Sequence, residues 1–217
     1  MIPVAGEPFL EWVIRYWVAQ GFRRFVVSLG HLAEAGERFC AARRGSGLEI
    51  ETVVEPEPLG TGGAIHFAAA CKGVSDPFAA ANGDSLVVAD MRPALELMNE
   101  PDIDGVLLGV PVPDAARYGS LVVEDGRLVG FREKRPGSGM INGGVYLLRR
   151  RMLDWFPPQR PLSIESETFP ALLAAGAHFR VLPADAPFLD IGTPESIQQA
   201  ESFIGAHFTA GRDTITV

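Results

Sequence analysis

The sequence predicts an α/β fold: a mostly parallel, doubly wound sheet flanked by helices, with a small antiparallel β subdomain laid over it. Helix-like and strand-like segments alternate over about the first 110 residues, which is typical of βαβ units. From about residue 115 onward, short strands around turn signals replace this alternation, as in an antiparallel meander. Because no linker divides the 217 residues, we expect a single domain over 1–204 and a C-terminal tail over 205–217.

The alternating half begins with a predicted helix over residues 9–20. Pro8 suits its first turn, Gly21 suits the position after its last turn, and apolar residues recur between them at helical spacing. The apolar run 25–29 predicts a buried strand, and a second helix follows over 32–42. Residues 48–54 alternate with period two, which predicts a half-buried strand.

Four further elements complete this half. Residues 61–71 are alanine-rich and helical in pattern, and the short apolar run 78–82 predicts a strand that leads into Gly83 and Asp84. A helix over 91–99 and a strand over 105–110 follow. The order strand, helix, strand is thus repeated to the end of the first half.

The second half begins with a predicted hairpin. Strands over 120–124 and 127–131 flank Asp125-Gly126, a type I′ turn signal. A strand over 141–148 follows a Gly/Pro loop. The closing elements are helices over 150–155 and 166–174, two short strands, and a final helix from Pro194.

Composition excludes several classes of protein. The net charge of −8 argues against a nucleic-acid binder, whose footprint is a basic face. Cys40 and Cys71 are too few for a disulfide scaffold and lack metal-ligand spacing, so buried thiols are expected. No apolar run approaches the roughly 18 residues of a membrane span, and no leader pattern opens the sequence. We therefore expect a cytoplasmic protein without a nucleic-acid or membrane partner.

The segment from Glu55 to Ala64, Glu-Pro-Glu-Pro-Leu-Gly-Thr-Gly-Gly-Ala, is the first with chemical content. A strand ends just before it, and Gly60 and Thr61 open a helix after its prolines. Glycine lets a ligand approach the backbone, and a helix N-terminus favours an anion or a polar edge. The alternative is an ordinary turn with Thr61 as the helix N-cap. The segment matches neither a Walker A loop nor a G-x-G-x-x-G fingerprint.

Two aspartates follow predicted strands. Asp84 ends Asn82-Gly83-Asp84, and Asp190 ends an apolar strand before a helix that Thr193 caps. Ligands of α/β sheets bind beyond the carboxyl ends of strands, and carboxylates there suit Mg²⁺. A turn-capping role for Asp84 is the alternative, and sequence spacing alone does not show that the two carboxylates meet.

Two further segments offer ligand contacts. Glu133-Lys134 ends a hairpin strand, where the lysine could hold a phosphate or the pair could be a solvated surface ion pair. Asn142, Gly143 and Gly144 lie at the mouth of a strand, where glycine suggests close approach and the amide could bind hydroxyl groups. Core or surface roles fit the four histidines better than catalysis, and no G-x-S-x-G or H-E-x-x-H motif is present.

Seven motifs, in this order, resemble those of the sugar-1-phosphate nucleotidyltransferases. They are Pro-Leu-Gly-Thr-Gly-Gly-Ala (58–64), Asn-Gly-Asp (82–84), Arg-Tyr-Gly (117–119), Phe-Arg-Glu-Lys (131–134), Ile-Asn-Gly-Gly-Val-Tyr (141–146), Ser-Ile-Glu (163–165) and Asp-Ile-Gly-Thr-Pro-Glu (190–195). The sequence is most similar to the guanylyltransferases that act on heptose 1-phosphate and mannose 1-phosphate. The resemblance implies a GT-A-like, Rossmann-like fold over nearly the whole chain.

The resemblance also implies residue roles. Asp84 and Asp190 would be catalytic carboxylates that hold Mg²⁺, and Lys134 would be a catalytic residue on the sugar phosphate. The sugar phosphate would contact Gly119, Glu133, Lys134, Asn142 and Glu165, and the nucleotide would contact Glu55, Gly60 and Thr61. A carboxylate such as Glu55 favours guanine, whose N1–H and N2–H₂ are adjacent donors, although Glu57 is also nearby.

The implied reaction transfers GMP from GTP to a heptose or mannose 1-phosphate, giving the nucleotide sugar and pyrophosphate for surface polysaccharide synthesis. Two alternatives remain: a thymidylyl- or uridylyltransferase acting on a hexose 1-phosphate, and a catalytically impaired relative that binds nucleotide or sugar phosphate. A homodimer is compatible with the guanylyltransferase and with both alternatives. The family also has a first strand, a G-G-x-G-T-R loop and a Pro-Lys pair ahead of the residues matching Met1 onward, so we expect little or no turnover from the 217-residue form.

Overall fold

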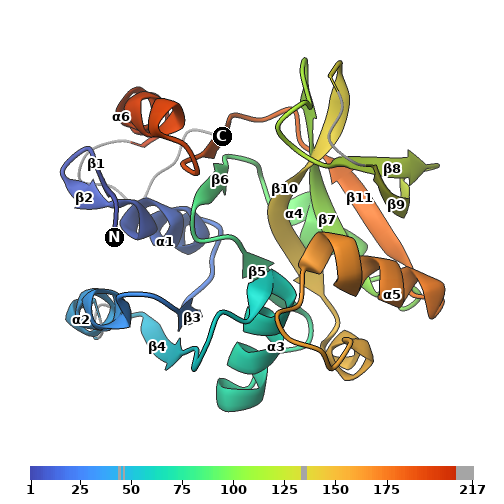
Figure 1. The fold of residues 1–217 in the computed structure, drawn as a ribbon, viewed down its shortest axis with the longest axis horizontal. Helices are drawn as coiled ribbons and strands as arrows, with labels where there is room; N and C mark the ends of the chain where they lie inside the picture. The colour runs from blue at the N-terminus through green and yellow to red at the C-terminus, as the bar shows by residue number, and fades with distance from the viewer. Residues whose placement is uncertain (44, 46, 133–135, 209–217) are drawn as a thin grey trace.

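The computed structural model describes residues 1–43, 45, 47–132 and 136–208, and its elements follow the expected order of helices and strands (Figure 1). The helical elements are α1 (Phe9–Ala19), α2 (Ala33–Ala42), α3 (Gly60–Lys72), α4 (Arg92–Leu97), the 3₁₀ helix η1 (Arg150–Trp155), the π-helical turn η2 (Ile164–Thr168), α5 (Phe169–Ala174) and α6 (Pro194–His207). The strands are β1 (Pro3–Val4), β2 (Glu7–Pro8), β3 (Arg24–Leu29), β4 (Glu49–Val54), β5 (Phe78–Ala81), β6 (Ser85–Val87), β7 (Gly105–Val112), β8 (Ser120–Glu124), β9 (Arg127–Arg132), β10 (Gly139–Leu148), β11 (Phe179–Pro183) and β12 (Phe188–Asp190).

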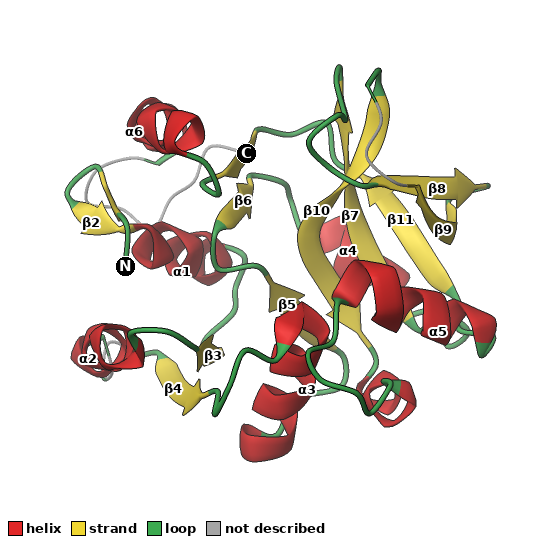
Figure 2. Cartoon of the chain, in the orientation of Figure 1, coloured by secondary structure: helices red, strands yellow, loops and turns green. Residues whose placement is uncertain are grey.

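The main sheet has the strand order β5-β10-β7-β11-β9-β8, and it is mixed rather than mostly parallel (Figure 2). Within it only β7 and β11 are paired in parallel, while β10 runs antiparallel to both β5 and β7. The expectation of a mostly parallel sheet is therefore wrong. The alternation of helix and strand in the sequence does not determine strand direction. After β7 the chain forms the β8–β9 hairpin, and β10 then runs antiparallel to β7.

The expected antiparallel subdomain is part of this sheet. Strands β8 and β9 form a hairpin whose turn residues Asp125 and Gly126 both have positive φ, as a type I′ turn requires. An additional pairing of Ile141 with Ser120 joins β10 to β8. This pairing closes β10, β7, β11, β9 and β8 into a small barrel.

In the part of the chain that the structure describes, three two-stranded sheets lie outside the main sheet: β3 with β4 in parallel, β6 with β12 antiparallel, and β1 with β2 antiparallel. Strand β3 was expected to be buried, yet most of its residues are only half-buried. Its hydrogen-bonded neighbour among the described residues is β4 alone, which leaves its other edge unpaired there. The short strand β6 was not predicted, because the pattern of three residues after Asp84 is too brief to distinguish from a turn.

The apolar core lies on both faces of the main sheet. One cluster joins α1, α6 and β6 to one face of β7 and β10, through residues such as Tyr16, Leu86, Leu108 and Ile141. The other cluster joins η1, η2 and α5 to the opposite face, with Phe169 fully buried at its centre. Helix α5 lies in front of the sheet in Figure 1 and α4 behind it.

Helix α1 confirms the predicted periodicity and adds two polar anchors. The Trp12 indole donates to the carbonyl oxygen of Val4, and the Tyr16 hydroxyl donates to that of Ala89 at 2.8 Å. The carboxylate of Glu11, which is only 1% exposed, contacts the guanidinium groups of Arg15 at 2.6 Å and Arg43 at 2.9 Å. Paired in this way, the buried charge links α1 to the end of α2.

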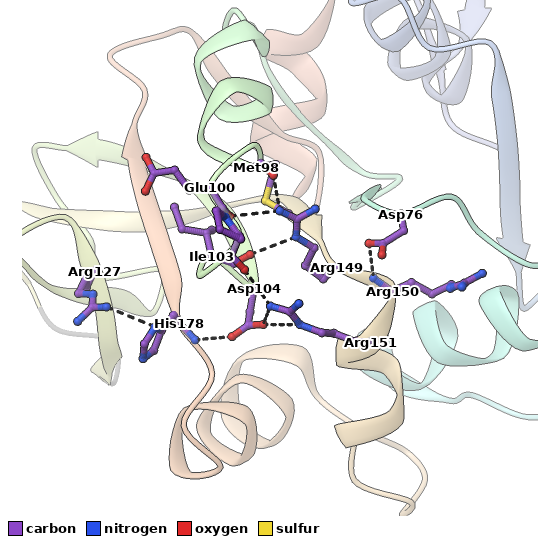
Figure 3. A network of polar contacts seen from close by, with 11 residues as sticks. Asp76, Met98, Glu100, Ile103, Asp104, Arg127, Arg149, Arg150, Arg151 and His178 are labelled. Carbon is purple, nitrogen blue, oxygen red and sulfur yellow. Dashed lines mark hydrogen bonds and ion pairs between the residues drawn. The ribbon is translucent and has the colours of Figure 1, made fainter.

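A network of charged side chains surrounds the end of β10 that lies beyond Leu148 (Figure 3). The Arg151 guanidinium donates twice to Asp104 Oδ1, at 2.9 and 2.7 Å, and the backbone N–H of His178 donates to Asp104 Oδ2 at 2.8 Å. Arg149 donates to backbone carbonyls that follow α4, including that of Met98. Each partner of Asp104 is thus supplied by the protein itself.

Helix α6 continues through His207, past the boundary expected at residue 204. Its N-terminus carries the predicted cap, with Thr193 and Ser196 in a reciprocal capping box and Pro194 in the first turn. Over the described part of the chain, none of the helices combines the length and the apolar character that crossing a membrane would take.

Candidate active site

Asp84 and Asp190 are brought together by the pairing of β6 with β12. The register places Asp190 opposite Ser85, the residue after Asp84. The N–H of Ile191 also donates to the carbonyl oxygen of Asp84 at 2.9 Å. The condition that sequence spacing could not test is therefore met: the fold places the two aspartates next to each other.

The two carboxylates influence each other electrostatically. Asp84 is open to solvent on one side, but partial burial of its carboxylate and, secondly, the negative charge of Asp190 raise its pKa. Among the described residues, neither aspartate forms an ion pair. Two oxygen-donor carboxylates that repel each other fit a divalent cation such as Mg²⁺, which would relieve this repulsion.

The rest of a magnesium shell would come from outside the protein. Within the described ranges, no group of three or more His, Cys, Asp or Glu residues gathers at one point. Mg²⁺ keeps waters and substrate phosphates among its ligands and needs only one or two carboxylates from the protein. The two carboxylates of Asp84 and Asp190 fit this coordination preference of Mg²⁺.

A bulge in β10 connects the segment that carries Asp84 to Asn142. The β10–β7 register is interrupted between Asn142 and Tyr146, where Gly144 has φ +70°. The backbone N–H of Asn82 donates to the Gly144 carbonyl at 2.9 Å, and a Cβ on Gly144 would lie 2.6 Å from the Asn82 side chain. Glycine at 144 therefore permits the loop that carries Asp84 to approach the bulge. The close approach at this glycine is thus between two segments of the chain.

Asn142 and Glu165 form a direct pair across two elements. Asn142 Nδ2 donates to Glu165 Oε1 at 2.6 Å and to the Tyr146 hydroxyl oxygen at 2.7 Å. Asn142 Oδ1 accepts from the N–H of Gly144 at 3.1 Å. Glu165 stands in η2, whose start is capped by Ser163, which accepts from the N–H of Ser166. The structure thus joins two of the residues expected to contact the sugar.

Gly119 lies beside the same pair. A Cβ built on Gly119 would be 3.6 Å from Glu165 Oε2 and 3.6 Å from the Arg132 carbonyl oxygen. Its backbone therefore borders Glu165 Oε2, which has no hydrogen-bond partner among the described residues. The preceding residue, Tyr118, packs edge-to-face on Phe188 of β12, and burial followed by the charge of Asp190 raises the pKa of its phenol.

Glu55 lies at the far end of β4, in the loop before α3. Its Oε1 accepts from the Ser28 hydroxyl at 2.8 Å and its Oε2 from the N–H of Leu59 at 3.1 Å. The carboxylate therefore closes its own loop and still keeps one lone pair on each oxygen for another donor.

The glycines after Glu55 have a structural reason that the sequence did not reveal. Gly60 has φ +70°, and a Cβ there would lie 2.6 Å from the carbonyl oxygen of Leu162. The N–H groups of Gly62 and Gly63 donate to that same oxygen, at 2.9 and 3.3 Å. Helix α3 begins at Gly60 with Leu59 in the N-cap position, so the alternative of Thr61 as N-cap is wrong. Thr61 itself is exposed in the first turn.

Glu133 and Lys134 lie outside the described residues, so their predicted roles stay predictions. Among the described residues, sequence reasoning missed three that hold the site: Ser28 on Glu55, Asn82 on the bulge, and Tyr146 on Asn142. Asn82 and Tyr146 stand within the motifs at 82–84 and 141–146, but no role was predicted for either. Ser28 lies in an apolar strand, where a single polar group gave no separate signal.

Comparison with known proteins shows the family to which the chain belongs. The family model for nucleotidyl transferases matches residues 1–207. D-glycero-α-D-manno-heptose 1-phosphate guanylyltransferase of Aneurinibacillus thermoaerophilus is 31% identical over 202 residues, which cover 93% of this chain and 86% of that protein. Mannose-1-phosphate guanylyltransferase of Mycobacterium tuberculosis is 36% identical over 199 residues, covering 90% of this chain and 55% of that protein.

Among solved structures, HddC of Yersinia pseudotuberculosis in complex with GMP-PN has a TM-score of 0.82 and 31% sequence identity. The match covers 94% of this chain and 88% of that one. The similarity in sequence and fold extends over nearly the whole of this chain, and the chain belongs to the nucleotidyl transferase family.

Proposed function

We propose that this sugar-1-phosphate nucleotidyltransferase transfers GMP from GTP to a heptose or mannose 1-phosphate, with Mg²⁺ as its cofactor. The products would be the nucleotide sugar and pyrophosphate, and the nucleotide sugar would serve surface polysaccharide synthesis. Support for the guanylyl and mannose-type assignments comes from the relatives at 31% and 36% identity.

One observation carries the proposal: the carboxylate pair Asp84–Asp190 lies next to the bulge that holds Asn142 and, through it, Glu165. Paired carboxylates suit the metal-bound phosphates of a nucleotide. An amide and a carboxylate with free acceptor positions suit the hydroxyl groups of a sugar. Both groups of residues meet at one place, as a reaction between these two substrates requires.

The reaction would be an in-line displacement at the α-phosphorus of the nucleotide. An oxygen of the sugar phosphate forms the new P–O bond, and the bond to pyrophosphate breaks with its electron pair leaving on the pyrophosphate oxygen. Asn142 and Glu165 would hold the sugar so that its phosphate reaches this line, and Lys134 would hold the phosphate. Mg²⁺ bound by Asp84 and Asp190 would neutralise charge on the phosphoryl oxygens. The chain therefore contributes chiefly position and electrostatics.

The preference for guanine rests on Glu55. Its two oxygens keep one lone pair each after bonding Ser28 and Leu59, and adjacent acceptors match the N1–H and N2–H₂ donors of guanine. Glu55→Gln would place a donor against one of these hydrogens. We expect Glu55→Gln to weaken GTP binding about tenfold or more and to leave UTP binding unchanged.

The test is a pyrophosphate-release assay over GTP, dTTP, UTP and CTP against mannose, heptose, glucose and galactose 1-phosphates. The proposal expects the highest kcat/KM for GTP with a mannose-type sugar and a loss of turnover when Mg²⁺ is chelated. A preference for dTTP or UTP with a glucose-type sugar would contradict the guanylyl assignment. Calorimetric binding of each substrate, measured in parallel, separates a protein that binds without turnover from one that does not bind.

A further inference from the structure

The hydrogen bonds of Asn142 settle which way its side-chain amide points. The Gly144 N–H can donate only to an acceptor, and the Glu165 carboxylate can accept only from a donor. With the amide reversed, Asn142 Oδ1 would face Glu165 Oε1 at 2.6 Å and Nδ2 would face an N–H group. Only one orientation is therefore compatible with both neighbours, and it directs Nδ2 toward Glu165 and Tyr146.

In this orientation both hydrogens of Nδ2 are used within the protein. One goes to Glu165 Oε1 at 2.6 Å and the other to the Tyr146 hydroxyl oxygen at 2.7 Å. What remains for a ligand are acceptors: a second lone pair on Asn142 Oδ1 and the free lone pairs of the Glu165 carboxylate. This part of the site therefore suits the O–H donors of a sugar.

Tyr146 is rigidly held in the place from which it contacts Asn142. It is 1% exposed, directly follows the bulge in β10, and pairs in register with Ala80 of β5 and Leu107 of β7. Its ring packs against that of Phe169, with the ring centroids 5.3 Å apart, and Phe169 directly follows the π-helical turn that carries Glu165. Burial raises the pKa of the Tyr146 phenol, so its oxygen stays protonated and neutral near neutral pH.

We propose that Tyr146 is a positioning residue for sugar binding: its hydroxyl occupies one hydrogen of the Asn142 amide, locks the amide against Glu165, and leaves an acceptor-only face for two or more sugar hydroxyls. This inference rests on the proposed function, because it assigns Asn142 and Glu165 to the sugar. Tyr146 itself need not touch the sugar. Its effect passes through Asn142.

The first experiment is Tyr146→Phe, which keeps the ring in the core and removes only the hydroxyl. We expect the Kd for the sugar 1-phosphate that the wild type binds best to rise about 3- to 10-fold, the range of one net hydrogen bond, with the GTP affinity unchanged. Tyr16→Phe is the matched control, since it too removes a buried tyrosine hydroxyl, in this case one that donates to the backbone carbonyl of Ala89, away from Asn142. It should lower the Tm without altering the sugar Kd.

A double-mutant cycle shows whether Tyr146 acts through Asn142. With Asn142→Ala in place, adding Tyr146→Phe should change the sugar Kd less than about twofold, because the amide it positions is gone. Equal fold-changes of Tyr146→Phe in the two backgrounds would overturn the proposal, as would an unchanged Kd in the single variant. If the wild type binds no sugar 1-phosphate, the proposed function fails instead.

Hydrogen exchange of the Asn142 side chain tests the lock without any variant or ligand. In the NMR spectrum of the free protein, both Nδ2 hydrogens should exchange with solvent at least about tenfold more slowly than those of exposed Asn99. Exchange as fast as that of Asn99 would overturn the lock, whatever the substrate proves to be.

Discussion

Strand β10 has charged and polar side chains at both of its ends, and the two ends use them differently. At the end beyond Leu148, Asp104 is 8% exposed and each of its carboxylate oxygens accepts from protein donors (Figure 3). At the Asn142 end, Asp84 and Asp190 repel each other and form no ion pair among the described residues, although Asp190 Oδ1 accepts from the N–H of Gly192, and Glu165 keeps acceptor positions for a ligand.

The difference distinguishes a structural polar network from a binding site within one sheet. For a buried carboxylate whose partners are all within the protein, removal of the carboxylate or of one partner destabilises the fold. Carboxylates that repel each other lower the stability of the free protein, and a bound cation relieves that repulsion. Substitutions at the two ends should therefore separate activity from stability.

The largest effect is expected for the carboxylates at the Asn142 end. Asp190→Asn and Asp84→Asn should each lower kcat/KM by about 10³-fold or more, because electrostatic stabilisation of the phosphoryl oxygens is lost. Steady-state pyrophosphate release at saturating Mg²⁺ measures this loss against the wild type, in a form of the protein that turns over. Asp102→Asn, at an exposed aspartate on the other end of β7, is the control and should leave the rate unchanged. A loss below tenfold in either variant would contradict the assignment of the metal site.

The next effect is one of stability. Asp104→Ala should lower the free energy of unfolding by about 2 kcal/mol, because it leaves the His178 N–H without its acceptor and the half-exposed Arg151 guanidinium with water alone. Denaturant unfolding measures this change. The KM values for both substrates should stay at wild-type levels. A tenfold change in either KM would show that the two ends of β10 are not independent.

Gly144→Ala tests the bulge that connects the substrate residues to the Asp84 loop. Its φ of +70° and the 2.6 Å approach of Asn82 predict a destabilisation of about 1–3 kcal/mol. In contrast to Asp104→Ala, this variant should also raise the KM for the sugar, since Asn142 accepts from the Gly144 N–H. Gly130→Ala in β9, where a Cβ meets nothing within 4 Å, is the control. An unchanged KM in Gly144→Ala would mean that the bulge does not shape the sugar site.

The smallest effect concerns the stability of the protein without ligand, and here the substitution should stabilise the fold rather than destabilise it. The raised pKa of Asp84 means that the folded state binds its proton more readily than the unfolded state, whose value is near 3.8. Ionised Asp84 therefore lowers stability at pH values above its folded pKa, and this penalty disappears as the pH falls below about 3.8. Asp84→Asn should raise the Tm at pH 7 without Mg²⁺, and the difference should vanish toward pH 3.5. A lower Tm for Asp84→Asn at pH 7 would contradict the repulsion between the two carboxylates.

Much of the fold could be predicted because its signals are local. The helical spacing before Gly21 predicted α1, and Asp125-Gly126 predicted the hairpin. Strand direction and sheet order depend on pairings between distant segments, which no local pattern contains. For this reason the sheet was expected to be mostly parallel and is mixed.

The candidate site shows the same limit. Asp84, Asn142, Glu165 and Asp190 could be singled out by residue type and motif, but their meeting depends on the β6–β12 register and the β10 bulge. Gly60 could be recognised as a special position, but not as the point where Leu162 approaches. Tyr146 ends the motif at 141–146, but no role was predicted for it, because a tyrosine in an apolar strand is ordinarily a core residue.

The division between the two ends of β10 is tested most directly by one paired measurement: the calorimetric Kd for a mannose-type 1-phosphate and the Tm of Glu165→Gln and Asp104→Asn. We predict that Glu165→Gln weakens sugar binding about tenfold with a Tm within 2 °C of the wild type, and that Asp104→Asn lowers the Tm by about 5 °C or more with an unchanged Kd. An unchanged Kd in Glu165→Gln, or a Kd that changes in Asp104→Asn, would contradict this account.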